Sequence, residues 1–382
     1  MKQHIEEIDV LRIIGFIFVV AQHVFGGFAW REGVSFSDSL VLSFLYVVAK
    51  PAVPIFITIA VMMMIYTHTE PVNWTQFYKK RFIYTVIPYV IWTALNIWDA
   101  KQYGEVSFGP FWGQLLAGTG RYHLWYMSMM LRIYLYFPLI LGLTKIISQR
   151  SQVFKANFLL FFTLAYIFLL EHNDVTNWVG QFLFTYPTEN EQRFLDRTPI
   201  LWSIYIVLGI YIILRHSKFK TWIKRYQKQM LIAYIPLLLY NYYVEVCNAI
   251  PGHAVSTGYF YETSYVLFMI CSIFVFYNFA CYISKEKNKL YFKLKEVSNY
   301  TYTAYLAHVI VLQAVFKYFT RFSSIESPLA IGVIVFILTI LITFKLTELL
   351  SLLPFSEYLL GTKKKYHSKW ITKGKFNPVD MK

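Results

Sequence analysis

The chain has 382 residues, of which 57% are hydrophobic, 20% aromatic and only 15% charged, and its formal net charge is +15. An ordinary soluble domain carries about 25% charged residues, and disordered, collagen-like and coiled-coil chains need polar, glycine-periodic or charge-rich sequences. The composition excludes all of these, and three cysteines in apolar segments exclude a disulfide-bonded secreted scaffold. The composition as a whole predicts a polytopic membrane protein.

Ten apolar segments are long enough to cross a bilayer as helices, because a span takes about 20 residues. In chain order they lie at about 9–30, 41–67, 82–99, 122–147, 157–171, 200–215, 229–247, 260–283, 300–318 and 329–353. We therefore expect an all-α membrane helix bundle of about ten transmembrane helices in a single domain over residues 1–355, followed by a basic tail at 356–382.

Basic residues divide unequally between the two sets of loops that these spans would create. One set holds most of them, including 79–81, 215–228, 285–295 and the tail. Because cytoplasmic flanks carry an excess of Lys and Arg, we expect both termini in the cytoplasm, with the tail near anionic lipid. The same scatter argues against nucleic acid as a partner. The opposite set holds only seven basic residues, namely Arg31, Lys101, Arg121, Arg193, Arg197, Lys317 and Arg321.

The first span contains two polar side chains, Arg12 and His23, in the segment LRIIGFIFVVAQH. A separation of eleven residues is three helical turns plus about 20°, so both lie on one face, about 16 Å apart, and are expected to share one channel. Asp9 can hold the guanidinium of Arg12. Arg can bind phosphate and a neutral His can deprotonate a hydroxyl, which suits acyl transfer from a coenzyme A thioester. An Arg that reaches the membrane surface and a hydrogen-bonded bundle His remain equally open interpretations.

Later spans contain further ionisable residues. His308 follows Tyr305 in TYTAYLAHVIV, and Arg132 lies about ten residues from either end of the fourth span. A charge at bilayer depth costs about 2.5–3.5 kcal/mol on insertion scales, so His308 and Arg132 are candidates for lining a cavity. Lys50, which precedes Pro51, is a weaker candidate. No P-loop, HExxH or Cys/His metal pattern occurs, so we expect no metal and no permanently bound cofactor.

Several segments together resemble the acyltransferase-3 family of integral membrane acyltransferases. EEIDVLRIIGFIFVVAQH is similar to a first helix with LDGLR followed after ten residues by His, and VPIFITIAVMMM is similar to VPLFFxLSGYLL, with Ala60 and Val61 in place of Ser-Gly. The basic segment FYKKRFIYTVIPYVIW resembles FYxxRxxRIxPxY, with Thr85 where a second Arg is usual. HLWYM and TYTAYLAHV resemble HLWFL and SYGIYLLH.

The resemblance implies transfer of an acyl group, usually acetyl, from acyl-CoA as co-substrate to a hydroxyl of an extracytoplasmic or lipid-linked carbohydrate, in the bacterial cytoplasmic membrane. It implies that His23 is the essential histidine, with Arg12 as its partner, and that Arg12, Lys80 and Arg81 bind the donor. The supporting or cavity-lining group that we expect is made up of residues in the matching motifs together with Arg132, which its depth in the fourth span selects: Asp9, His123, Trp125, Arg132, Tyr305 and His308.

The resemblance is to family members without an extracytoplasmic SGNH hydrolase-type domain. The chain is therefore expected to act alone or with a separate acyltransferase or glycan-synthesis protein. The chief alternative is an exporter or flippase of a polysaccharide or its lipid-linked precursor, and a membrane sensor is a third. The sequence shows no internal repeat of the kind found in many transporters, which disfavours the exporter.

Overall fold

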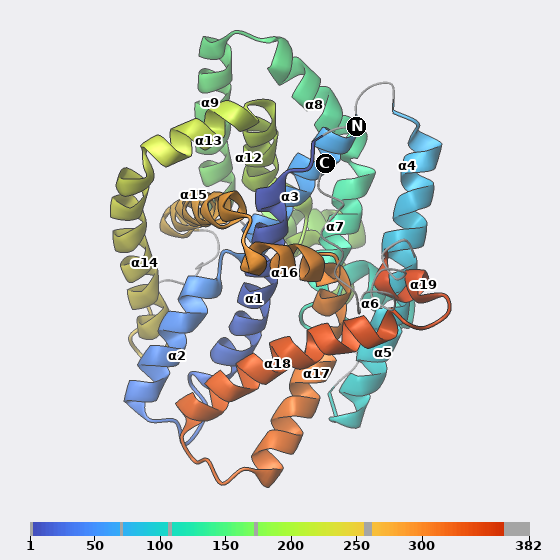
Figure 1. Ribbon diagram of the computed structural model, residues 1–382, viewed down its shortest axis with the longest axis vertical. Coiled ribbons are helices and arrows are strands. Elements are labelled where there is room, and N and C mark those ends of the chain that lie inside the picture. The colour runs from blue at the N-terminus through green and yellow to red at the C-terminus, as the bar shows by residue number, and fades with distance from the viewer. Residues whose placement is uncertain (1–2, 69–71, 106–108, 172–174, 256–261, 363–382) are drawn as a thin grey trace, which may run out of the picture.

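The computed structural model describes residues 3–68, 72–105, 109–171, 175–255 and 262–362. Every regular element in these ranges is a helix, so the predicted all-α class is confirmed (Figure 1). Helix α1 (Glu6–Phe28) lies at the centre of the fold. Around it pack α2 (Phe36–Ala49), α3 (Ala52–Thr67), α15 (Thr263–Glu286), α16 (Lys289–Ser298), α17 (Thr301–Phe322) and α18 (Pro328–Leu350).

The other helices extend this centre on its flanks. A sharp bend of 60° separates α7 from α8, where Pro138 stands at the start of the second helix. The flanking helices are α5 (Ile87–Gln102), α6 (Phe111–Ala117), α7 (Trp125–Leu135), α8 (Phe137–Gln149), α9 (Gln152–Glu171), α10 (Val175–Phe184), α11 (Glu189–Asp196), α12 (Ser203–Leu214), α13 (His216–Arg225), α14 (Gln227–Ala249) and α19 (Ser356–Leu360).

The basic segment that resembles the family motif folds as one continuous helical rod. Helix α4 (Trp74–Arg81) leads into a π-helical turn, η1 (Phe82–Val86), and then into α5. Pro88 lacks an N–H and its ring would clash with the carbonyl four residues earlier, so the helix widens, and the N–H of Ile87 bonds to Phe82 O instead. The widened turn begins directly after Arg81.

The described residues contain seven helices or fused helices long and apolar enough to span a membrane, and the bent pair α7/α8 makes an eighth. The predicted segments at 82–99 and 300–318 are also helical but are outside this set. Helix α5 has only 16 residues, and α17 is made more polar by His308, Gln313 and Lys317. The fold is that of a multi-pass membrane protein.

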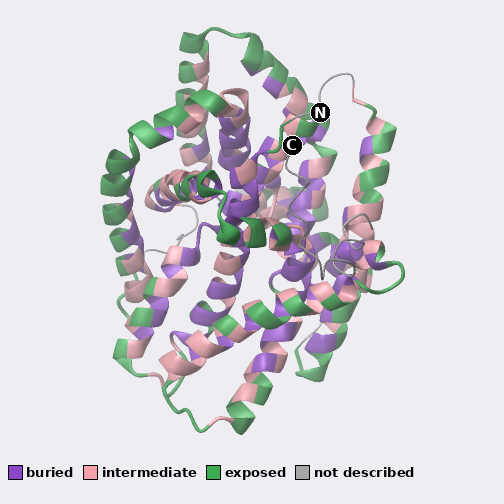
Figure 2. Ribbon diagram, in the orientation of Figure 1, coloured by how far each residue is buried: buried purple, intermediate pink, exposed green. Residues whose placement is uncertain are grey.

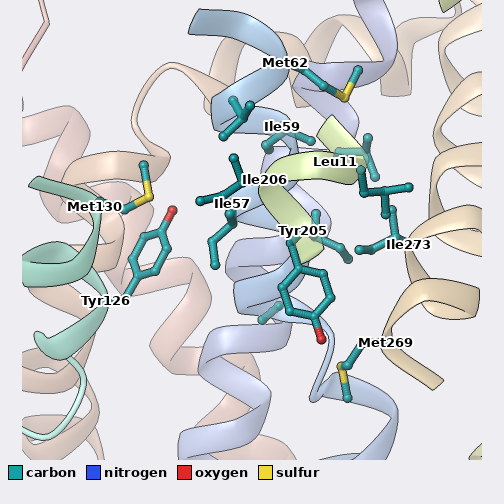
Figure 3. Close-up of a cluster of buried hydrophobic side chains, with 14 of the residues drawn as sticks. Leu11, Ile57, Ile59, Met62, Tyr126, Met130, Tyr205, Ile206, Met269 and Ile273 are labelled. Atoms are coloured by element: carbon teal, nitrogen blue, oxygen red, sulfur yellow. The ribbon is translucent and has the colours of Figure 1, made fainter. Parts of the chain in front are cut away.

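Burial follows the same plan, with buried residues gathered around α1 and exposed residues on the outer helices (Figure 2). On α9, Phe161 is 74% exposed and Phe168 is 63% exposed, which suits contact with hydrocarbon rather than water. The core includes Leu11 of α1, Ile57 of α3 and Ile206 of α12, with Tyr126 and Met130 of α7 on one side (Figure 3). This packing fixes the positions of α1 and α3, two helices that carry polar residues of the site described below.

Residues 356–362 of the predicted basic tail are described, and they pack back on the helices. Trp92 Nε1 donates to Leu359 O at 3.0 Å, and Thr303 Oγ1 donates to Leu360 O at 2.9 Å. These bonds join α19 to α5 and α17. Residues 363–382 of that tail lie outside the described residues.

Gly118 ends α6 in the left-handed region, with φ of 69°. A Cβ at this position would lie 2.5 Å from Trp125 Cα and 2.9 Å from Leu124 O, and neither backbone atom can move away cheaply. We expect Gly118→Ala to lower the free energy of unfolding by about 3 kcal/mol, as judged by thermal unfolding in detergent. Gly142→Ala is the control, because that glycine lies in α8 with nothing within 4 Å. Equal stability of the two variants would contradict the prediction.

Candidate functional site

A cavity of about 340 Å³ opens between α1, α3, α4, α7 and α17, and we call it the Arg12 cavity. Arg12 and Arg81 supply its two cations, and methionine and aromatic side chains supply most of the remaining wall. Arg12 Nη1 lies 3.6 Å from Asp9 Oδ1, as the helical spacing predicts. Arg81 is held differently, with its guanidinium 4.8 Å from the ring centre of Tyr134. The cavity therefore presents two positioned cations next to an apolar wall.

Asp9 is itself held from two further directions. His4 Nε2 lies 2.5 Å from Asp9 Oδ2, and Ser298 Oγ donates to Asp9 Oδ1 at 3.4 Å. Asp9 is buried, whereas the side chain of Arg12 keeps 34% of its surface exposed. The carboxylate thus orients the guanidinium and leaves it accessible to an anion.

A second cavity, of about 430 Å³, lies beside the other end of α1, and we call it the His23 cavity. Its lining combines the imidazole of His23 with amides from Gln22 and Gln313, the carboxylate of Glu245, the guanidinium of Arg31 and the ring of Tyr122. Amides, carboxylates and aromatic rings can bind hydroxyl groups and stack on the apolar faces of rings. The two amides and the carboxylate in this wall have no counterpart in the described lining of the Arg12 cavity.

Three histidine rings and one tyrosine ring lie between the two cavities, and we call them the ring layer: His23, His123, Tyr305 and His308. His23 and His308 stack with centroids 5.3 Å apart, and His308 lies 4.8 Å from His123. Tyr305 lines the Arg12 cavity, and its ring lies 5.7 Å from that of His308. The ring layer therefore reaches from one cavity to the other.

The hydrogen bonds of the ring layer identify the tautomer of His308. His308 Nδ1 lies 2.6 Å from Tyr305 O, and since a carbonyl can only accept, Nδ1 must carry the hydrogen. Nε2 is then the unprotonated nitrogen of a neutral ring, and it makes no hydrogen bond to described residues. The hydroxyl of Tyr305 donates to His123 O, which ties α17 to the loop before α7. One neutral imidazole is thus left with a buried, unused acceptor.

The arrangement corrects the expectation that Arg12 and His23 share one open channel. Arg12 lines one cavity and His23 lines the other, because the rings of Tyr305, His308 and His123 occupy the space between them. His23, His123, Tyr305 and His308 are four of the predicted site residues, and the structure brings their rings together. Sequence spacing gave no indication that these rings would separate the two cavities.

Six predicted site residues are absent from both cavity linings. Asp9, His123 and His308 contact lining residues as described above, whereas the other three lie elsewhere. Lys80 is exposed on α4, and Trp125 packs its ring 5.3 Å from that of Trp202. Arg132 is buried, and its guanidinium donates to Phe194 O at 2.6 Å and to Arg197 O at 2.8 Å. In the described structure, Arg132 thus joins α7 to the end of α11.

Within the described ranges, no group of three or more His, Cys, Asp or Glu side chains is placed to hold a metal ion.

The family model described as an acyltransferase domain matches residues 5–348 of this chain, which include every residue lining the two cavities. The chain belongs to the acyltransferase-3 family. No curated protein and no solved structure matches it.

The membrane acyltransferase has cavity residues that sequence reasoning missed. Tyr122 and Glu245 line the His23 cavity and were not predicted, whereas Tyr126, which belongs to the HLWYM match but was not chosen as a site residue, lines the Arg12 cavity. A signal for Glu245 was present, because it is an isolated acid in an apolar span and Lys50 is an isolated base in another. Lys50 Nζ lies 2.6 Å from Glu245 Oε2.

The Lys50–Glu245 pair provides a stability prediction. Glu245→Leu leaves the Lys50 ammonium, whose side chain is 2% exposed, without its carboxylate. Loss of one partner of a buried pair costs about 3–5 kcal/mol, and we expect about 3 because the rings of Tyr46 and Tyr265 lie 4.7 and 5.9 Å from Nζ. The double variant Lys50→Met/Glu245→Leu should recover most of the loss in thermal unfolding. A double variant no more stable than the single one would show that the pair is not coupled.

Proposed function

We propose that this acyltransferase moves an acyl group, acetyl in the simplest case, from acyl-CoA to a hydroxyl of a cell-surface or lipid-linked carbohydrate. The observation that carries the proposal is the ring layer, which lies between a cavity with two cations beside methionine and aromatic side chains and a cavity lined by amides and a carboxylate. An acyl donor with phosphates and an acceptor with hydroxyls can approach the same imidazoles from opposite sides.

The Arg12 cavity suits the donor. Arg12 and Arg81 can bind coenzyme A phosphates through charge-assisted hydrogen bonds. The walls formed by Met63, Met130 and Tyr126 are apolar and adaptable, as the pantetheine arm requires. We propose that this cavity opens to the bacterial cytoplasm, with both termini on that side and α5 and α17 completing a bundle of ten spans.

The His23 cavity suits the carbohydrate. Gln22, Gln313 and Glu245 can orient sugar hydroxyls, and the rings of Tyr46 and Tyr122 can pack against the sugar faces. A cavity of about 430 Å³ is within the range of roughly 300–1,000 Å³ that is usual for small-ligand sites. One sugar hydroxyl would then reach the imidazole of His23.

Transfer proceeds by direct attack. His23 accepts the proton of the sugar hydroxyl while the oxygen forms a bond to the thioester carbonyl carbon, and the carbon–sulfur bond then breaks. The proton passes to the departing sulfur, so coenzyme A leaves as the free thiol. His308 stacks on His23 at 5.3 Å and keeps a neutral ring beside it during the step. Small opening of the ring layer at Tyr305 brings the thioester to His23.

The test uses the full chain in proteoliposomes with radiolabelled acetyl-CoA and a lipid-linked glycan. Label that enters the glycan as a base-labile ester supports the proposal. Movement of the glycan across the bilayer without incorporation of label would overturn the proposal in favour of the exporter. Absence of both transfer and movement across a panel of neutral and acidic glycans would also overturn it.

A further inference from the structure

A third cavity, of about 240 Å³, gathers cations on the side of the fold that carries few of them. Lys101, Arg121, Arg193 and Arg197 line it. These are four of the seven basic residues in the sparsely charged loop set. Extracytoplasmic loops carry few Lys and Arg residues. The presence of four of them around one cavity therefore indicates that they have a function there. We call it the Arg121 cavity.

Arg121 is the buried member of this group. Its side chain has no exposed surface, yet Nη2 lies 3.0 Å from Glu105 and Nη1 lies 3.3 Å from Asp99. Nε is buried and makes no hydrogen bond to described residues. A buried guanidinium with an unused donor is costly unless something binds to it.

Arg197 and Lys101 form no salt bridge with a carboxylate in the described structure, so each adds a positive charge to the cavity wall. Arg197 Nη1 donates to Ala117 O at 3.1 Å, which satisfies a hydrogen bond but does not neutralise the charge. Asp196, its neighbour in the chain, accepts a hydrogen bond from Gln192 instead. Arg193, by contrast, pairs with Glu189 at 2.6 Å. Glu105 also lines the cavity, and the four cations outnumber their paired carboxylates, Asp99, Glu105 and Glu189, by one. An anion can neutralise this remaining positive charge.

Tyr122 connects this cavity to the site of the proposed reaction. Tyr122 lines both the Arg121 cavity and the His23 cavity, and its ring lies 4.9 Å from that of His23. A ligand that extends over Tyr122 can therefore place one group among the cations and another beside His23. The volume of about 240 Å³ equals that of roughly eight water molecules at about 30 Å³ each, enough for a phosphate or diphosphate.

We infer that the Arg121 cavity binds a phosphate-type oxyanion carried by the acceptor. The inference rests on the proposed function and adds to it the class of acceptor, a phosphorylated glycan. The oxyanion can be the diphosphate that joins a glycan to its lipid or a phosphate on the glycan itself, and both present the same oxygens to Arg121, Arg197 and Lys101.

Binding is tested first, without any acyl transfer. The full chain in detergent, saturated with coenzyme A to occupy the Arg12 cavity, is titrated calorimetrically with inorganic pyrophosphate. We expect binding by the wild type and at least a tenfold weaker affinity in both Arg197→Gln and Lys101→Gln. Lys101 is exposed, so its substitution leaves folding intact. Arg321→Gln is the matched control, because Arg321 belongs to the same loop set but does not line the cavity.

Absence of pyrophosphate binding by the wild type would overturn the inference, and so would equal losses of affinity in Lys101→Gln and Arg321→Gln. A transfer assay then compares a lipid-linked glycan diphosphate, the same glycan with a single phosphate and no lipid, and the unphosphorylated glycan. The phosphorylated acceptors should have KM values at least tenfold lower, an advantage that Lys101→Gln removes. Pyrophosphate binding without any acyl transfer would count against the proposed function alone, whereas transfer with no preference for phosphate would count against this inference alone.

Discussion

His23→Ala is expected to reduce the rate of acyl transfer by about 10²–10⁴-fold, the usual contribution of a positioned general base. The loss should appear in kcat, because His23 acts on the proton in transit rather than on the binding of the donor. Its ring is one of four in the ring layer and lines the His23 cavity, so in the proposed mechanism its removal leaves the sugar hydroxyl without an acceptor for its proton. Initial rates with radiolabelled acetyl-CoA measure the effect.

The control for this substitution is His253→Ala, which removes an exposed imidazole in the loop after α14 and should leave the rate unchanged. Thermal unfolding of the two variants should agree closely, because His23 is only half-buried. Label transfer at more than about a tenth of the wild-type rate in His23→Ala would remove His23 from the mechanism, since that loss lies well below the range expected of a general base.

Arg81→Gln should raise the KM for acyl-CoA by roughly 10–150-fold with little change in kcat. A charge-assisted hydrogen bond contributes about 1.5–3 kcal/mol, and every 1.4 kcal/mol is about tenfold in affinity. Arg81 lines the Arg12 cavity at the start of the π-helical turn, where Tyr134 holds its guanidinium. Saturation kinetics at fixed acceptor concentration measure the change.

Lys80→Gln is the matched comparison, because Lys80 carries the same charge as Arg81 and is its neighbour in the chain. The side chain of Lys80 is exposed and lies outside the cavity. A loosely held surface charge contributes about 0–1 kcal/mol, so the KM should rise no more than a few-fold. Equal increases in the two variants would mean that Lys80 binds the donor as the family resemblance implies and that the cavity wall alone does not define the donor site.

The sequence predicted those parts of the site that depend on local geometry. Asp9 and Arg12 stand three residues apart on one helix, and helical spacing is enough to bring them together. His23 could be placed on the same helix for the same reason. Their separation into two cavities could not be foreseen, because the rings between them come from α17 and from the loop before α7, and only tertiary packing brings those elements to α1.

The span predictions likewise succeeded where local sequence determines the structure and fell short where tertiary packing does. Hydropathy found strongly apolar helices such as α9, most of which is not buried inside the protein. It also predicted helices where α5 and α17 lie, although the length and polarity of these two differ from those of an ordinary span. The polarity of α17 has a tertiary cause, since His308 and Tyr305 face other helices rather than hydrocarbon.

The thinness of the ring layer has a consequence for the integrity of the cell. If only the acetyl group passes the ring layer, which is one side chain thick, coenzyme A itself never has to cross the bilayer. In the described part of the chain, aromatic and imidazole rings packed edge to face separate the two cavities, and such a layer of side chains opposes the passage of protons or sodium down the membrane potential. Such an enzyme can work in an energised membrane without discharging it.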